Sequence, residues 1–230
     1  MDTVALPPPE MERALDFLAL TNRAFGGTTV VLRRLRAWAD GWPRDRELTI
    51  LDAGCGEADI PVAVARWARD AGRRVAITAV DSVAEAAAVA RARAAAWPEV
   101  RVVHGDVFAV AAGARFDVVT ASLFLHHLAP DRTVAALAAL ARAATRGVIV
   151  SDLLRSRAGY AAVWAASRAF GNRVVRHDGP LSVRRAFTVA ELDGLAAAAG
   201  VPWLAARREP WFRVSLSGLR PAELSAPTRN

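Results

Sequence analysis

Short apolar blocks alternate with longer amphipathic stretches through most of the chain. A short apolar block predicts a buried strand, and apolar positions with helical spacing predict an amphipathic helix. The predicted strands are Leu48–Asp52, Val75–Val80, Val100–His104, Phe116–Ala121 and Gly147–Ser151. The predicted helices between them are Ala58–Ala71, Val83–Trp97, Val107–Ala112 and Asp131–Ala144. This alternation predicts an α/β domain, in which helices cover both faces of a parallel sheet.

The pattern changes at both ends of this core. Before it, helical spacing predicts helices at Glu10–Phe25 and Thr28–Ala39, separated by a Gly-Gly break. At the other end, the apolar runs Val201–Arg207 and Trp211–Leu216 have so short a connection that only an antiparallel hairpin fits. We therefore expect a doubly wound, mostly parallel, seven-stranded sheet with an antiparallel terminal hairpin and N-terminal helices.

The helix predicted at Thr188–Ala199 carries its own start signal. Glu191 follows Thr188 by three residues, which is the spacing of a capping box. The resulting division of the chain is an N-terminal helical cap (1–45), a catalytic domain (46–217) with a lid-like insertion (155–187), and a flexible tail (218–230).

Composition narrows the class of protein. The 230 residues are 53% hydrophobic, which suits one sizeable α/β domain. No apolar run reaches the ~18 residues needed to span a bilayer, and the acidic, proline-rich start lacks the pattern of a secretory signal. The single cysteine, Cys55, excludes an internal disulfide, and we expect a cytoplasmic protein. All basic residues behind the net charge of +7 are arginine, a bias that fits a GC-rich genome and a solvated surface.

The stretch ILDAGCGEADIP, residues 50–61, carries the strongest chemical signal. Gly54 and Gly56 fall between the first strand and its helix, where a doubly wound sheet binds ligands. Glycine there lets a ligand lie against bare backbone. A dinucleotide fingerprint requires a third glycine where this chain has Asp59. Asp52 instead favours an adenosyl ligand that bears an ammonium and a sulfonium.

LDAGCGEADIP resembles motif I of the class I S-adenosylmethionine-dependent methyltransferases, and three further motifs follow in order: ITAVDSV, VVHGDVF and FDVVTASLFLHHL. The resemblance covers roughly Leu48–Leu216 and implies a Rossmann-like methyltransferase fold. It also implies S-adenosyl-L-methionine as cofactor and S-adenosyl-L-homocysteine as product. The ending GEADIP and the stretch NRAFGGTTVVLRRLR are similar to the small-molecule branch, of ubiquinone and natural-product type.

The resemblance assigns cofactor contacts residue by residue. Asp81 would bind both ribose hydroxyls, since a carboxylate accepts two hydrogen bonds. Asp106 would face the adenine amino group, and the strand end at Ser122 would border the methyl group. Each acid has a structural alternative, because aspartate also caps turns and ends strands. The full predicted cofactor set is Asp52, Gly54, Cys55, Gly56, Asp81, Ser82, Asp106, Val107 and Ser122.

Two histidines follow the fourth motif strand. Methyl transfer to a hydroxyl requires loss of a proton, and an imidazole is a suitable base. His126 and His127 are the candidates, and the resemblance favours His127. The alternatives are that this histidine caps a helix or packs beneath a lid, and that proximity alone drives transfer. Ser122 and Leu123 offer no acidic cage, so we expect no metal.

The segment 155–185 concentrates positive charge, with seven arginines and a single acid, Asp178. We expect it to follow the fifth strand and to lie over the carboxyl ends, with one helix at Tyr160–Phe170. It would then hold an aromatic or amphiphilic acceptor. The alternatives are an apolar face that packs on Glu10–Phe25 beneath solvated arginines, and contact with a membrane surface. The predicted acceptor contacts are Tyr160, Trp164, Arg173, Arg176 and His177.

The sequence therefore predicts a metal-independent methyltransferase for a small molecule, with a phenolic or polyketide-like hydroxyl or an activated carbon as acceptor. An RNA-modifying enzyme that uses the arginine-rich segment as a phosphate track is the alternative, although no appended RNA domain is apparent. A module that keeps the fold without the reaction is a third class. The oligomeric state has no signal in the sequence.

Overall fold

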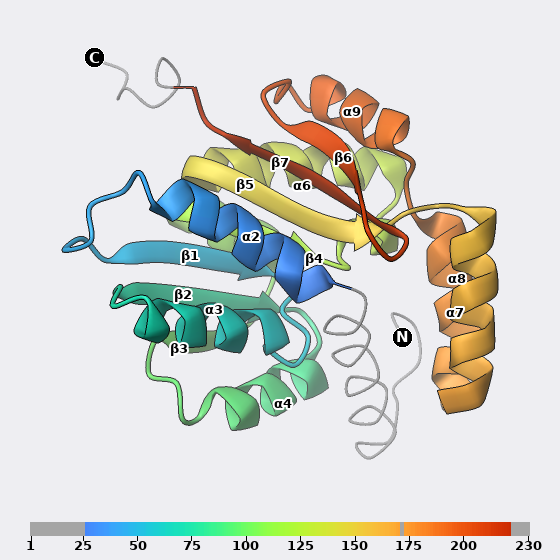
Figure 1. Ribbon diagram of the computed structural model, residues 1–230, viewed down its shortest axis with the longest axis horizontal. Coiled ribbons are helices and arrows are strands. Elements are labelled where there is room, and N and C mark those ends of the chain that lie inside the picture. Colours follow the sequence, from blue (N-terminus) through green and yellow to red (C-terminus); the bar gives the residue numbers. More distant parts are fainter. Residues whose placement is uncertain (1–25, 171–172, 222–230) are drawn as a thin grey trace.

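The computed structural model of the chain describes residues 26–170 and 173–221, with the side chains of 170–174 excepted. The helix predicted at Glu10–Phe25 and most of the predicted tail lie outside these residues. Figure 1 shows a sheet with helices on both sides and a helical pair beyond one end.

Seven strands form one sheet with the order β3-β2-β1-β4-β5-β7-β6. Strands β1 to β5 run parallel, and β7 runs antiparallel to both of its neighbours, β5 and β6. This confirms the predicted doubly wound, mostly parallel sheet with an antiparallel terminal hairpin. The strands are β1 (Leu48–Ala53), β2 (Val75–Asp81), β3 (Val100–His104), β4 (Phe116–Ser122), β5 (Ala144–Leu153), β6 (Ala205–Glu209) and β7 (Arg213–Leu219).

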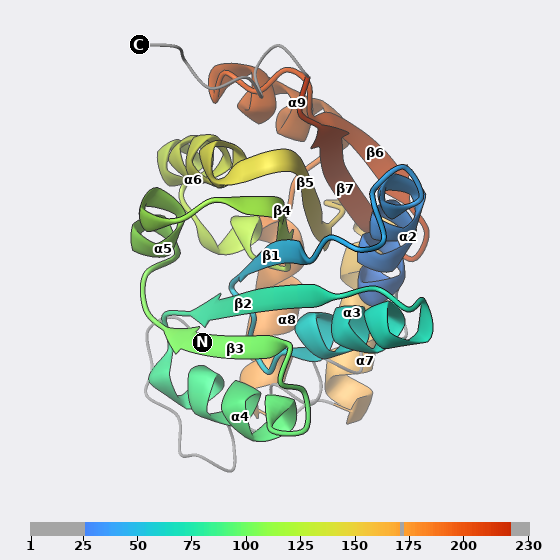
Figure 2. The ribbon, with the colours of Figure 1, turned by 90° about the vertical axis from the view of Figure 1, so that its left-hand side faces the viewer.

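Helices cover both faces of the sheet, as Figure 2 shows edge-on. One buried cluster joins the sheet to α2 (Gly27–Ala39), α3 (Asp59–Asp70) and α4 (Ala84–Ala94). The other joins it to α5 (Val107–Gly113), α6 (Pro130–Ala143) and α9 (Val189–Ala198). Alternating apolar residues on each strand feed the two clusters in turn, which is why the predicted strands read as nearly continuous apolar runs.

Several boundaries differ from those predicted. Strand β5 begins before the predicted Gly147, and α4 ends before the predicted Trp97. Strand β7 extends to Leu219, so the boundary predicted between the catalytic domain and the tail falls inside a strand. The capping box on Thr188 and Glu191 is present as predicted, with both reciprocal hydrogen bonds formed.

The segment after β5 differs most. One helix was expected there, and the structure has two, α7 (Arg157–Phe170) and α8 (Arg173–Arg185). Gly179 and Pro180 argue against a helix at α8 on local grounds. A β-carbon on Gly179 would lie 3.2 Å from Val163, so α8 packs closely on α7 at this point. Packing between the two helices therefore outweighs the local preference. The pair lies beyond the carboxyl ends of the parallel strands (Figure 1).

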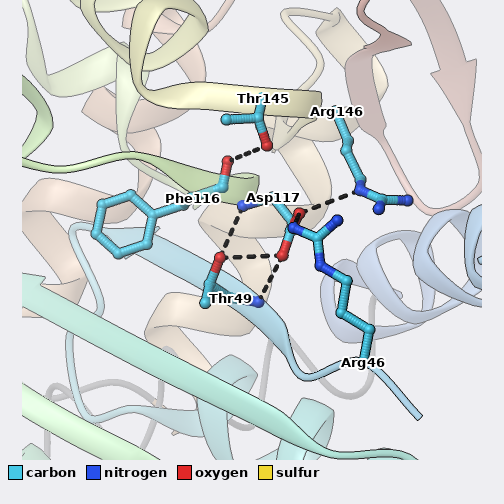
Figure 3. A network of polar contacts seen from close by, with 6 residues as sticks. All are labelled: Arg46, Thr49, Phe116, Asp117, Thr145 and Arg146. Atoms are coloured by element: carbon cyan, nitrogen blue, oxygen red, sulfur yellow. Dashed lines mark hydrogen bonds and ion pairs between the residues drawn. The ribbon is translucent and has the colours of Figure 1, made fainter. Parts of the chain in front are cut away.

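A polar network centred on Asp117 lies at the other end of the parallel strands, where they begin (Figure 3). This carboxylate is 2% exposed and accepts hydrogen bonds from the backbone amide and hydroxyl of Thr49, both at 3.0 Å. Arg46 and Arg146 donate to its other oxygen at 2.9 and 3.1 Å. The network joins the beginnings of β1, β4 and β5. The amino ends of these strands are thus held together by hydrogen bonds, and the candidate site lies at their carboxyl ends.

Candidate active site

The loop between β1 and α3 follows an unusual backbone path. Gly54, Gly56 and Ala58 have φ values of 70°, 54° and 63°, all in the left-handed region that favours glycine. The amides of Gly54 and Cys55 both donate to the carbonyl oxygen of Val80, each at 2.9 Å. These bonds tie the loop to the end of β2, so the first two strand ends form one unit.

The two glycines of this loop serve different purposes. A β-carbon at Gly54 would come within 2.6 Å of the Phe124 ring, so this position is needed for packing against the chain after β4. A β-carbon at Gly56 would meet no heavy atom within 4 Å. Bare backbone at Gly56 therefore faces open space, as expected where a cofactor passes close to the chain. This fits the predicted cofactor.

Asp52 lies directly before this loop and is 3% exposed. The hydroxyl of Thr120 donates to its carboxylate at 2.5 Å. Burial raises the pKa of Asp52 to about 7, the Thr120 bond opposes this, and the charges of Asp59 and Asp81 raise it further. A carboxylate in such surroundings favours a nearby cation, and a bound ammonium or sulfonium would supply one.

Asp81 is the last residue of β2, and Asp106 follows the end of β3 by two residues. Asp81 accepts hydrogen bonds from the amides of Gly56 and Val83, both at 2.9 Å. Its pKa is raised by burial, despite these two bonds. Asp106 caps α5 by accepting from the amide of Phe108 at 2.9 Å, so the capping alternative holds for this acid. A carboxylate has spare acceptor capacity, and capping is compatible with ligand contact.

The remaining predicted cofactor contacts fall into two environments. Cys55 and Val107 are buried, and Ser82 is exposed at the end of β2. Burial raises the pKa of the Cys55 thiol further above its usual value, which keeps it protonated and inert.

Ser122 and Ser151 are register partners at the ends of β4 and β5. Both hydroxyl oxygens are buried, and within the described part of the chain neither has a hydrogen-bond partner. Buried polar atoms are normally satisfied, so this pair marks a place where a ligand or water would bond. Ser122 was predicted from the sequence and Ser151 was missed.

The short 3₁₀ helix η1 (Leu125–His127) brings both candidate histidines to the same place. His126 is 4% exposed, and its Nδ1 lies 2.6 Å from Oδ1 of Asp152. His127 is exposed, and its ring centroid lies 4.2 Å from that of His126. The two rings thus meet, one held in the interior and one open to solvent.

Asp152 and Arg213 are charged residues of this site that the sequence analysis did not single out. Burial alone would raise the pKa of Asp152, but the charge and hydrogen bond of His126 outweigh it, and the pKa is lowered. Arg213 is 1% exposed; burial lowers its pKa to about 10, opposed by Asp152 and Asp59. Like the other acids, Asp152 lies at the carboxyl end of a strand, and this position in the sequence could have identified it. Arg213 gives no such signal.

The predicted acceptor contacts lie on the two helices beyond the strand ends. Tyr160 and Trp164 are exposed on α7, and Arg176 and His177 are exposed on α8. His177 Nδ1 lies 3.0 Å from Asp178. Arg173 begins α8, and its side chain lies outside the described part of the structure. Helix α8 lies against η1, which carries the two histidines.

Among residues 26–170 and 173–221, no group of three or more histidine, cysteine, aspartate or glutamate side chains could hold a metal ion. Across the same residues, no helix is both long and apolar enough to cross a membrane.

Comparison with known proteins agrees with this geometry. Residues 50–147 match a family described as "Methyltransferase domain". No curated protein matches the chain.

Solved structures with the same fold include a SAM-dependent methyltransferase from Aquifex aeolicus, with a TM-score of 0.63, 14% identity and coverage of 94% of this chain and 99% of that one. Magnesium protoporphyrin IX methyltransferase from Synechocystis PCC 6803 has a TM-score of 0.58 and 18% identity, covering 85% and 84% of the two chains. The CurJ carbon methyltransferase has a TM-score of 0.60 and 13% identity, covering 84% and 53%. At these identities the similarity shows the fold.

The Synechocystis enzyme was crystallised with both S-adenosylmethionine and S-adenosylhomocysteine. The matched family covers the glycine loop and the first four strand ends. Residues 50–147 therefore match a methyltransferase domain, and the fold around them is that of the solved methyltransferases named above.

Proposed function

We propose that the protein transfers a methyl group from S-adenosylmethionine to a small molecule, at a phenolic or polyketide-like hydroxyl or an activated carbon. The observation that carries this proposal is the arrangement at the ends of β1, β2 and β3. Asp52, Asp81 and Asp106 lie at or just after the ends of these neighbouring strands, and Gly56 offers bare backbone in the first of the loops that follow. Three acids and an open glycine suit a cationic adenosyl ligand.

Each cofactor residue then has a distinct task. Asp52 offers its carboxylate to the positive charge, Asp81 to the ribose hydroxyls, and Asp106 to the adenine amino group. Ser122 offers its unpartnered hydroxyl at the end of β4. The bound cofactor supplies an electrophilic methyl group on a sulfonium. Holding the acceptor in line with that group is worth ~7–11 kcal/mol through positioning alone.

The proton of a hydroxyl acceptor has a receiver close by. His127 is our proposed base because it is exposed beside the strand ends. His126, whose ring lies against that of His127 and is hydrogen-bonded to Asp152, is the second candidate and orients the pair. An activated-carbon acceptor also gives up a proton, which the same ring would receive, whereas catalysis by proximity would need neither ring.

The acceptor would be held from α7 and α8. Arg176 and His177, with Arg173 at the start of α8, are the proposed contacts for an acidic or polar part of the acceptor. Tyr160 and Trp164 are proposed for its aromatic part at the rim. Citrinin polyketide synthase contains a C-methylating domain of the same fold, with a TM-score of 0.59 and 13% identity. It supports a natural-product acceptor without identifying one.

The test is incubation of the protein with methyl-labelled cofactor and a panel of phenols, carboxylic acids and amines. We expect label in at least one phenol or enolisable carbon. A parallel arm offers bulk tRNA over a range of salt concentrations. Label in tRNA with none in the small molecules would replace this proposal with the RNA alternative, which none of the solved structures named above supports.

A further inference from the structure

Exposed large apolar side chains gather near one end of the described structure. Tyr160 and Trp164 on α7 are 38% and 44% exposed, and Trp211 between β6 and β7 is 63% exposed. Phe212, beside Trp211, lies so near α7 that a β-carbon on Gly159 would approach it to 3.1 Å. The other such residue in the described chain, Leu219, lies at the far end of β7.

Tyr160 and Trp164 lie at the border of the packed side of their helix and are partly exposed. Gly159 lies against Phe212, and Val163 and Ser167 lie against Gly179 of α8. Tyr160 lies seven residues before Ser167 and so borders this packed side, whereas Trp164 is turned further toward solvent. They are four residues apart and so share one exposed stripe. Each of the two side chains leaves more than a third of its surface in solvent.

The turn that presents Trp211 is itself unfavourable. Trp211 and Phe212 have φ values of 60° and 58°. Consecutive left-handed residues in a hairpin turn are ordinarily asparagine and glycine, because bulky side chains are strained there. Strained conformations of this kind are concentrated at functional positions. The chain thus maintains a strained turn that leaves a tryptophan in solvent.

Arginines flank these aromatic side chains. Arg157 and Arg168 are exposed on α7, and the Arg168 guanidinium lies 4.1 Å from the Trp164 ring centroid. Arg184 and Arg185 are exposed at the end of α8. The only acid in the sequence from 155 to 185 is Asp178. The region is therefore strongly positive.

We propose that Tyr160, Trp164, Trp211, Arg157 and Arg168, here called the aromatic–arginine surface, dock the protein reversibly on an anionic lipid bilayer. Tryptophan and tyrosine prefer the headgroup level of a bilayer, where an apolar ring and a polar group are both accommodated. Arginine is attracted to anionic headgroups within a short distance of the membrane. Both preferences are met along the stripe of α7, and Trp211 lies in the turn that packs against the same helix through Phe212.

A lipid surface fits better than a protein partner. A specific protein interface buries about 800 Å² on each side and uses charges of both signs to set its register. This surface offers three aromatic rings and cations alone. It therefore suits a flat, negatively charged surface with no fixed register. Tyr160 and Trp164 are also the proposed acceptor contacts, but vesicle binding needs neither cofactor nor acceptor, so its test can fail separately from that of methyl transfer.

The test is sedimentation of the full-length protein with vesicles of phosphatidylcholine alone and with about one-third phosphatidylglycerol. We expect binding to the anionic vesicles only, weakened about tenfold or more between low and high salt. The variants Trp164→Ala and Trp211→Ala should each weaken it by about fivefold through the lost interfacial aromatic. Leu219→Ala, an equally exposed apolar side chain elsewhere, should leave binding unchanged.

The contribution of the arginines is tested with a matched control variant. Arg157→Ala with Arg168→Ala should reduce binding, whereas Arg101→Ala on β3, also exposed, should not. Circular dichroism checks that every variant is folded. The proposal is overturned by equal binding to both kinds of vesicle, by no binding, or by equal loss in the control variants. Self-association abolished by Trp164→Ala, without vesicle binding, would assign the surface to a second copy instead.

Discussion

The imidazole of His126 donates from Nδ1 to Oδ1 of Asp152 over 2.6 Å, and both side chains are buried. The same carboxylate accepts the backbone amides of Leu125 at 3.1 Å and Leu153 at 2.7 Å. A carboxylate only accepts hydrogen bonds, so the Nδ1 of His126 carries a proton and its other ring nitrogen is left for a different partner. Asp152 thus fixes both the turn after β4 and the orientation of the His126 ring, which lies against His127.

We predict that Asp152→Asn lowers turnover strongly while cofactor affinity stays near that of the parent. The amide replaces one acceptor oxygen with a donor, so the His126 ring loses its fixed partner. We also expect the free energy of unfolding to fall by about 1–3 kcal/mol, since buried donors are left unsatisfied. Methyl-transfer rates with labelled cofactor, calorimetry with the cofactor, and urea unfolding at neutral pH measure turnover, cofactor affinity and stability in turn. Unchanged stability would show that the pair contributes nothing.

The pH dependence of this effect has a defined sign. The pKa of Asp152 is lowered in the folded state, so its stabilisation is present above the unfolded pKa and is lost as the pH falls through the folded one. The stability gap between parent and variant should therefore be widest at neutral pH and narrow in acid.

Asp117→Asn is the matched control. Asp117 is also buried and accepts several hydrogen bonds, but it lies near the beginning of β4, away from the candidate site. It should lose a similar amount of stability, about 1–3 kcal/mol, while turnover and cofactor affinity are retained. Loss of turnover in both variants would trace the effect to general destabilisation.

Gly56→Ala tests whether a ligand lies against the glycine loop. Gly56 and Gly72 have φ values of 54° and 62°, and a β-carbon at either would meet no atom within 4 Å. Both alanine variants should therefore lose a similar stability, on the order of 1 kcal/mol, from left-handed backbone strain. Only Gly56→Ala should weaken cofactor binding, because only its methyl group enters the proposed site. Equal cofactor affinity in the two variants would contradict this placement.

The sequence was informative where the signals are local. Alternating apolar blocks identified the seven strands, and the spacing of Thr188 and Glu191 identified a helix start. The three acids at successive strand ends were identified for the same reason, since a strand end and the acid beside it are neighbours in the chain. Their assigned contacts with the cofactor remain predictions.

Features that depend on distant parts of the chain were not predictable in this way. Asp152 and Arg213 belong to different strands, and their electrostatic relation exists only because β7 inserts beside β5. Helix α8 contains Pro180, which argues for a loop, yet packing on α7 makes it helical. Burial of His126 but not His127 likewise depends on where the fold places η1 relative to β5.

Asp81→Ala should weaken cofactor binding by about a hundredfold or more, because two charge-assisted hydrogen bonds to the ribose would be lost. The structure adds a complication, since Asp81 also holds the amides of Gly56 and Val83. Asp81→Asn keeps one acceptor oxygen for these amides and should bind more tightly than the alanine variant. Calorimetry on both variants checks the order. Parent-like affinity in the alanine variant would limit Asp81 to its structural role.

Asp52 couples stability and cofactor binding to pH in opposite directions. Its pKa is raised by burial from 3.8 to about 7, so the folded protein binds a proton that the unfolded chain releases. The associated stability is complete below 3.8 and is lost as the pH rises through 7. Asp52→Asn removes this titration, and its advantage over the parent in free energy of unfolding should grow from pH 5 to pH 8, reaching about 2–4 kcal/mol.

The cofactor should show the reverse dependence. The ionised carboxylate attracts a cationic ligand, so the parent should bind S-adenosylmethionine more tightly as the pH rises through 7, the pKa of Asp52, and release a proton on binding below it. Titrations in buffers of different ionisation enthalpy measure that proton directly. Asp52→Asn should bind weakly at every pH and release none. If Asp52→Asn binds the cofactor as tightly as the parent at pH 8, Asp52 does not contact the cofactor. If the variant is more stable than the parent but does not bind, this buried acid serves the ligand and lowers the stability of the fold.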